Sequence, residues 1–132
     1  MPMLLITTNV SASAVPADFN AHATKSLAEL LQKPPQFVLV SVSPNPLLTL
    51  GGTSDPAALV EIRSIGGVRG ENAQKVVTSL TDLIHEHLKV EAARVFVHLV
   101  DLDPSTVHGW HCGETRSDSL LALLFVYSTI GL

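Results

Sequence analysis

The chain has 132 residues, a formal net charge of −4 and only eight Lys and Arg residues. This length is typical of a single domain, and so few basic residues, none of them in a run, argue against nucleic-acid binding. Hydrophobic residues make up 46% of the chain and charged residues 15%, which indicates subunit interfaces as well as a core. The single cysteine, Cys112, excludes an internal disulfide and favours a reducing compartment.

No segment of the sequence is typical of a membrane span or a signal peptide. The first ten residues carry no basic region and are too short for a signal peptide. No apolar segment reaches the roughly 20 residues that a spanning helix needs. We therefore expect a soluble protein that is cytoplasmic, or secreted without a signal peptide.

The first third of the chain is predicted to form a strand, a helix and a second strand. Met3–Val10 is rich in β-forming residues. Asp18–Gln32 places its apolar residues near the 3.6-residue helical period, and the Lys-Pro-Pro run at 33–35 ends this helix. Phe37–Ser43 is β-branched and almost continuously apolar, as in a buried strand.

A loop rich in Pro and Gly then leads into a second copy of the same plan. Ala58–Ile65 alternates apolar and charged residues and is predicted to be a strand. Asn72–Leu88 has an apolar face at helical spacing, and Arg94–Val100 is a further strand.

This order predicts an α/β (α+β) fold made of two β-α-β units. Each helix is long enough to join two parallel strands, so we expect a four-stranded sheet with both helices on one face. The other face then needs a cover that the chain does not supply, and oligomerisation is the simplest one. The domain is expected to span 1–116, followed by an unusual apolar extension at 117–132.

A set of short motifs occurs in a fixed order along residues 2 to about 115. They are Pro2 directly after Met1, Thr8-Asn9-Val10, Val15-Pro16, Lys33-Pro34-Pro35-Gln36-Phe37, Gly51-Gly52-Thr53-Ser54-Asp55-Pro56, Ser64-Ile65-Gly66, Arg94-Val95-Phe96 and Gly109-Trp110. Each motif alone is weak, but the ordered set is specific. The sequence thus resembles the macrophage migration inhibitory factor family of the tautomerase superfamily, with the 51–58 run most like plant and algal members.

The resemblance implies a homotrimer in which three sheets wrap into a barrel. It implies keto–enol tautomerisation of phenylpyruvate-like, aromatic α-keto acids and of dopachrome-like substrates, without a cofactor or metal. Several members also act as cytokines, which implies a protein receptor. By matching positions, the catalytic residues are Pro2 and Lys33, and the substrate-binding residues are Ile65 of the same subunit, Phe96 and His98 of its neighbour, and an apolar lining of Met3, Phe37, Val107 and Trp110.

The implied chemistry suits these residue types. An amine in an apolar pocket beside the Lys33 cation loses basicity, because both influences disfavour its ammonium form. Such a Pro2 amine would act as a general base near neutral pH. Lys33 would hold the substrate carboxylate, and the backbone N–H of Ile65 would donate to the same anion. The amine exists only if Met1 is removed, since a retained Met1 makes the proline nitrogen an amide.

Each of these residues also has a structural interpretation. Pro2 would be an ordinary residue before a strand, Lys33 a cation that suits the C-terminal end of a helix, and the aromatic residues part of a core. At the level of function, the alternatives are a cytokine-like or regulatory binding protein with a vestigial pocket, and a structural trimer. The structural trimer leaves the joint presence of Pro2, Lys33 and Ile65 unexplained.

The sequence also departs from the family. Phe96 stands where well-studied members have a tyrosine, so a hydroxyl is lost while the aromatic wall is kept. His98 replaces an asparagine of animal members and would add pH dependence, because imidazole titrates near neutrality. Ala57 and Val60 replace the two cysteines of a Cys-x-x-Cys motif, which excludes a thiol–disulfide activity.

The C-terminal extension is the fourth departure. Its apolar run at 120–127 predicts a terminal helix or strand packed on the trimer, with a disordered tail as the alternative. The absence of a basic polar face argues against attachment to a membrane surface. His108, His111 and Cys112 match no established zinc spacing, so we expect no metal site.

Overall fold

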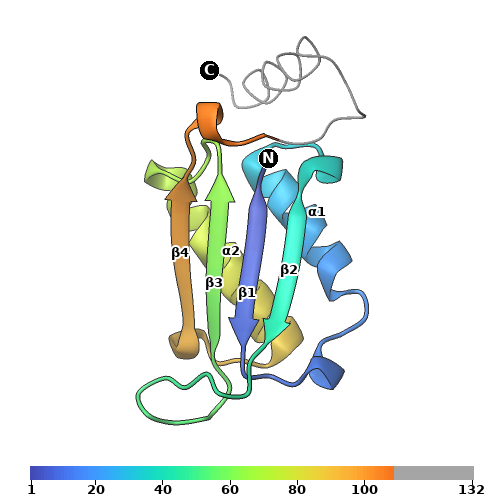
Figure 1. Cartoon of the computed structure of the whole chain (residues 1–132), viewed down its shortest axis with the longest axis vertical. Helices are drawn as coiled ribbons and strands as arrows, with labels where there is room; N and C mark the ends of the chain where they lie inside the picture. The colour runs from blue at the N-terminus through green and yellow to red at the C-terminus, as the bar shows by residue number, and fades with distance from the viewer. Residues whose placement is uncertain (109–132) are drawn as a thin grey trace.

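The computed structural model describes residues 1–108, which form two β-α-β units in succession (Figure 1). In chain order, the strands and α-helices of this part are β1 (Met3–Thr8), α1 (Phe19–Leu31), β2 (Leu39–Pro44), β3 (Ala58–Ser64), α2 (Gly70–Leu88) and β4 (Val95–Asp101). Each predicted strand and helix is present, with ends displaced by one or two residues. Short 3-10 turns are η1 (Ala12–Ala14), η2 (Pro35–Phe37), η3 (Ala92–Arg94) and η4 (Pro104–Thr106).

The strands form one mixed sheet in the order β2-β1-β3-β4. Within each half the strands are parallel, β1 with β2 and β3 with β4, and the helix between them makes the crossover. The antiparallel pairing of β1 with β3 joins the halves. Both helices lie on the same face of the sheet (Figure 1). The prediction of a four-stranded sheet with two helices on one face is therefore confirmed.

The core fills the space between this sheet face and the two helices. Alternate residues of a strand point to opposite faces, and in β1 and β3 the helix-facing ones are fully buried. The largest buried side chains are Phe19, Leu4, Ile6, Leu27, Leu31, Ile62, Leu80 and Ile84. Truncating such a leucine to alanine typically costs about 2–5 kcal/mol. This packing holds β1 rigidly, and with it the N-terminal residues that precede the strand.

The loop of residues 45–57 is held by two polar side chains rather than by a core of its own. The Asn9 amide donates to the carbonyls of Leu48, Ser54 and Asp55 at 3.2, 3.1 and 2.9 Å, and its oxygen accepts from Ala57 N at 2.8 Å. From the other side, the Arg94 guanidinium donates to carbonyls between Leu50 and Pro56. Asn9 and Arg94, each from one of the ordered sequence motifs, thus anchor this loop.

The second face of the sheet is not covered by any described part of the chain. Leu39, Leu59 and Phe96 lie on it with 47%, 47% and 57% of their surface exposed. Glu61 binds Arg63 here at 2.9 Å and lies 3.4 Å from His98 Nδ1. Among residues 1–108, no helix is long and apolar enough to cross a membrane.

Candidate active site

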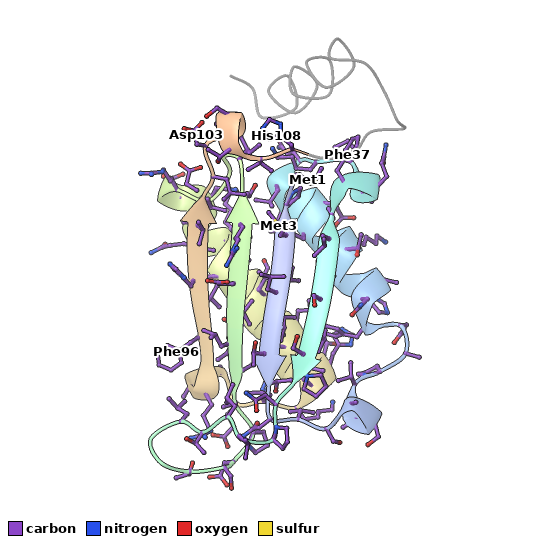
Figure 2. All side chains as sticks on the ribbon, viewed as in Figure 1. Met1, Met3, Phe37, Phe96, Asp103 and His108 are labelled. Carbon is purple, nitrogen blue, oxygen red and sulfur yellow. The ribbon has the colours of Figure 1, made fainter. Side chains whose placement is uncertain are left out.

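The N-terminal residues lie at the end of β1 where that strand begins. Pro2 is buried, and its carbonyl accepts a hydrogen bond from Leu39 N at 2.9 Å, which extends the β1–β2 pairing by one residue. Met3 follows on the side of the open sheet face and is half-buried. Figure 2 shows Met1, Met3 and Phe37 toward this same end of the molecule. The β1–β2 ladder therefore fixes the backbone that carries the candidate base.

The way α1 ends places Lys33 at the same end of the sheet as Pro2. Gln32 adopts a left-handed conformation (φ 52°) that closes the helix, and Lys33 N bonds back to Ala28 O at 2.9 Å. The Lys33 side chain is buried, with 4% of the residue exposed. Its Nζ donates to the carbonyl of Ile65 at 3.0 Å. A role confined to the helix dipole does not require such burial, so this arrangement favours the binding role.

Burial changes the titration of both amines at this end of the sheet. It lowers the pKa of Lys33 to about 8, because the ammonium is removed from water. The pKa of the Met1 amine falls to about 6, first through burial and then through repulsion by the Lys33 charge. Near pH 7 the terminal amine is therefore mostly uncharged while Lys33 is mostly protonated.

Ile65 also contacts Lys33 through its backbone carbonyl, which accepts a hydrogen bond from Lys33 Nζ at 3.0 Å. The predicted role of the Ile65 N–H as a donor to the substrate stays a prediction. The residue is 4% exposed and precedes a turn at Gly66 and Gly67, both with positive φ (74° and 77°). A side chain at Gly67 would place its Cβ 2.9 Å from Leu31, so the turn packs closely against α1.

The apolar candidates are only partly within the described residues. Phe37, in η2, and Val107, just after η4, are both half-buried. Trp110 lies outside the described residues, as do His111, Cys112 and the extension at 117–132. Among residues 1–108, no three His, Cys, Asp or Glu side chains are grouped as they would be in a metal site.

Phe96 and His98 are not close to Pro2 within one chain. In the register of the sheet, Phe96 pairs with Leu59, which in turn pairs with Thr7 at the opposite end of β1 from Pro2. Figure 2 accordingly shows Phe96 at the far end of β4 from Met1 and Met3. Within a single chain Lys33 binds Ile65 and its charge reaches the Met1 amine, next to Pro2 in the sequence. Any site that also includes Phe96 and His98 needs a second copy.

Two residues at the site escaped the sequence analysis. The Asp101 carboxylate accepts from Gly66 N at 3.1 Å and from Arg69 Nε at 2.6 Å. The hydrogen bond from Arg69, and to a smaller extent the one from Gly66, hold the pKa of Asp101 below its usual value. The carboxylate is therefore charged at neutral pH. Spacing gave no indication of this contact, because it joins residues 35 positions apart. The one hint in the sequence is the pair of glycines at 66 and 67, since adjacent glycines indicate a turn whose backbone conformation must be held by other groups.

Comparisons with known proteins agree with this architecture. A family profile described as macrophage migration inhibitory factor (MIF) matches residues 1–115. The rat macrophage migration inhibitory factor is 36% identical over 111 residues, which cover 84% of this chain and 96% of the rat protein. The factor from Trichinella spiralis superposes with a TM-score of 0.79 at 29% identity, covering 83% of this chain and 96% of its own. The homologue from Prochlorococcus marinus gives 0.73 at 29% identity, covering 83% and 95%. The chain belongs to the macrophage migration inhibitory factor family.

Proposed function

We propose that this chain is a keto–enol tautomerase of phenylpyruvate-like and dopachrome-like substrates, with the Pro2 amine as its base once Met1 has been removed. The observation that carries the proposal is a buried lysine ammonium close to the N-terminal amine. Burial, and after it the Lys33 charge, lower the pKa of the Met1 amine to about 6, and the Pro2 amine freed by removal of Met1 would meet the same two influences. A free base and a cation therefore coexist at neutral pH, which is what enolisation of an anionic keto acid requires.

The proton transfer can be assigned to named groups. In the enolising direction, the amine lone pair removes a proton from the carbon next to the keto group. The electrons of that C–H bond form the new double bond, and the keto oxygen takes up the negative charge. A proton from water then converts the enolate to the enol. In the ketonising direction the enol O–H gives its proton to water, and the protonated amine returns a proton to carbon. The Lys33 ammonium has three N–H donors, of which one binds Ile65, so the others can bind the substrate carboxylate.

The remaining contacts of the substrate would be apolar and shared between subunits. Met3, Phe37 and Val107 are half-buried and would contact the substrate ring, together with Trp110. Phe96 is 57% exposed on the open sheet face, where an aromatic ring is available to a neighbouring copy. We infer a homotrimer in which Phe96 and His98 of one subunit complete the site around Pro2 of the next.

A cytokine-like or regulatory protein with weak tautomerase activity is the second candidate. The curated relatives carry the name macrophage migration inhibitory factor. In addition, Phe96 lacks the hydroxyl that a tyrosine would bring to the pocket. On this interpretation the exposed aromatic face would contact a protein receptor.

The decisive experiment measures enol-to-ketone conversion of 4-hydroxyphenylpyruvate by the wild type and by Pro2→Gly. Intact mass must first show that Met1 is absent from both. We expect Pro2→Gly to lose at least about 10²-fold in kcat/KM, since the rigid secondary amine is replaced. Pro46→Gly, at an exposed loop position, is the matched control and should retain the wild-type rate. Equal rates in wild type and Pro2→Gly, or no conversion by either, would favour the regulatory protein.

A further inference from the structure

The peptide group between Ile65 and Gly66 is held from both sides by charged side chains. Its carbonyl, on Ile65, accepts from the Lys33 ammonium at 3.0 Å. Its N–H, on Gly66, donates to Asp101 Oδ1 at 3.1 Å. This peptide bond is trans, so the C=O and N–H of the unit point in opposite directions. Lys33 and Asp101 therefore lie at opposite edges of one peptide unit: the ammonium faces the partially negative carbonyl oxygen, and the carboxylate faces the partially positive N–H.

The sheet and the next loop hold Asp101 in this place. Asp101 is the last residue of β4 and pairs in register with Ser64, the last residue of β3. The ladder continues one step further, since Leu102 N donates to Ser64 O at 2.8 Å. The second carboxylate oxygen of Asp101 accepts from Arg69 Nε at 2.6 Å. Asp101 thus connects the end of β4 to the turn that begins at Ile65.

The turn itself depends on such ties because it contains two adjacent glycines. Gly66 and Gly67 are the residues with the widest choice of backbone conformations. The Gly66 carbonyl accepts from Ser64 Oγ at 2.9 Å, and the Gly67 carbonyl accepts from the Asn72 side chain. Of these hydrogen bonds, the one to Asp101 is made by the peptide group between Ile65 and Gly66, which is also the group that binds Lys33.

We propose that Asp101 is a positioning residue for Lys33, acting through the Ile65–Gly66 peptide; this inference rests on the proposed function. The carboxylate orients the peptide so that its carbonyl meets the ammonium. It also polarises that carbonyl, because hydrogen bonds in a chain strengthen one another. The Lys33 ammonium is thereby kept at the N-terminal amine, with its remaining donors directed to the carboxylate of the keto acid.

The first test compares Asp101→Ala and Asp101→Asn with the wild type in tautomerase kinetics. Asp101→Ala removes the acceptor for Gly66 N–H, and we expect KM for 4-hydroxyphenylpyruvate to rise about tenfold, as for loss of a charged hydrogen bond, with a smaller change in kcat. Asp101→Asn keeps an oxygen for that N–H but not the charge, so its KM should rise about two- to threefold. The exposed Asp82 of α2 supplies the matched controls, Asp82→Ala and Asp82→Asn, which should leave KM unchanged.

The second test needs no activity, because it follows Lys33 itself by NMR. The 13Cε signals of the lysines are followed as a function of pH in the full-length protein from which Met1 has been removed. In the wild type the Lys33 signal should titrate near pH 8, where burial places its pKa. In Asp101→Ala the midpoint should rise by about one pH unit, because a released ammonium regains water. If Asp101→Ala does not fold, the Gly66 amide proton of Asp101→Asn should move upfield, since a neutral acceptor binds it less strongly.

The outcomes separate this inference from the proposed function. An unchanged Lys33 midpoint together with an unchanged KM in Asp101→Ala would overturn the positioning role. If only Asp101→Asn folds, an unchanged chemical shift of the Gly66 amide proton together with a wild-type KM would also overturn the positioning role. A shifted Lys33 midpoint in a protein whose wild type converts no keto acid would support the positioning role and reject the tautomerase.

Discussion

Lys33 combines burial with a charge, and that charge adds to the effect of burial on the pKa of the N-terminal amine. The side chain is 4% exposed and has one carbonyl partner, so its ammonium is only partly compensated. Desolvation lowers its pKa to about 8, and its charge contributes to the pKa of about 6 at the N-terminus. The two groups therefore differ in protonation across a window of roughly two pH units.

This window leads to a prediction about the pH dependence of catalysis. We take the Pro2 amine of the processed chain to titrate near the pKa of about 6 of the Met1 amine, so below this pH it is protonated and cannot act as a base. Above about pH 8, Lys33 loses the charge that binds the carboxylate. We expect a bell-shaped profile of kcat/KM with its plateau between these values. In Lys33→Arg the descending limb should move to higher pH, because a guanidinium stays charged.

Steady-state kinetics from pH 5 to 10 would check this profile. Lys25→Arg, an exposed lysine of α1, is the control and should keep both limbs of the wild type. A descending limb that stays in place in Lys33→Arg would mean that another group is responsible for it.

At the scale of elements, the loop at 45–57 shows how a long connection is held without a core. The Asn9 side chain makes four hydrogen bonds to backbone groups of this loop, with donor–acceptor distances from 2.8 to 3.2 Å. Asn9 directly follows β1, and Arg94 directly precedes β4, so both anchors are placed by the sheet. The loop is thus fixed to the end of the sheet opposite Pro2.

Removing the Asn9 side chain should therefore cost stability without affecting the chemistry. For Asn9→Ala we expect the free energy of unfolding to fall by about 2–3 kcal/mol, because several backbone groups lose their partner. Urea unfolding at a fixed protein concentration would measure it, with an unchanged m-value. Asn20→Ala, at an exposed position of α1, should be neutral or slightly stabilising, since alanine favours a helix. If Asn9→Ala changes the free energy of unfolding as little as Asn20→Ala does, water replaces these hydrogen bonds in the variant.

At the scale of the whole molecule, the sheet leaves candidate site residues at opposite ends. Pro2 and Lys33 lie where β1 begins, whereas Phe96 lies near the start of β4. This part of β4 pairs with the start of β3, which pairs in turn with the last residues of β1 near Thr8. No motion within a rigid sheet brings them together, since the strands are hydrogen-bonded along their length. A site that contains both sets must therefore be formed between subunits.

This arrangement predicts that two inactive variants restore each other. Pro2→Gly lacks the rigid secondary amine, and a Phe96→Asp/His98→Ala chain lacks the contacts offered to a neighbour. In mixed oligomers, the intact Pro2 of one chain would meet the intact Phe96 and His98 of the other. We expect an equal co-refolded mixture to regain about a quarter of the wild-type rate, because in random trimers about one site in four combines an intact Pro2 with an intact Phe96 and His98.

The control mixes Pro2→Gly with a chain that carries all three substitutions, in which no complete site can form. Activity of the first mixture that does not exceed this control would show that the site lies within one subunit. The oligomeric state of each mixture is followed by sedimentation, so that a failure to assemble is recognised.

The sequence alone determined the elements and their order, because their signals are local. The apolar period of Asp18–Gln32 and the alternation in Ala58–Ile65 involve neighbours two to four residues apart, and each such pattern has one way of burying its apolar side. The resemblance then indicated the family, which the comparisons confirmed. The nomination of Pro2 and Lys33 rested on matching positions and stays a prediction.

Only the tertiary structure decided how the residues of the site act on one another. Lys33 meets the carbonyl of Ile65 across 32 positions, and Asp101 meets Gly66 across 35. Contacts at such separations depend on how strands pair and where helices end, and no local pattern records them. The contact of the Ile65 carbonyl with Lys33 has the same origin, because the turn after β3 sets the direction of the peptide group between Ile65 and Gly66.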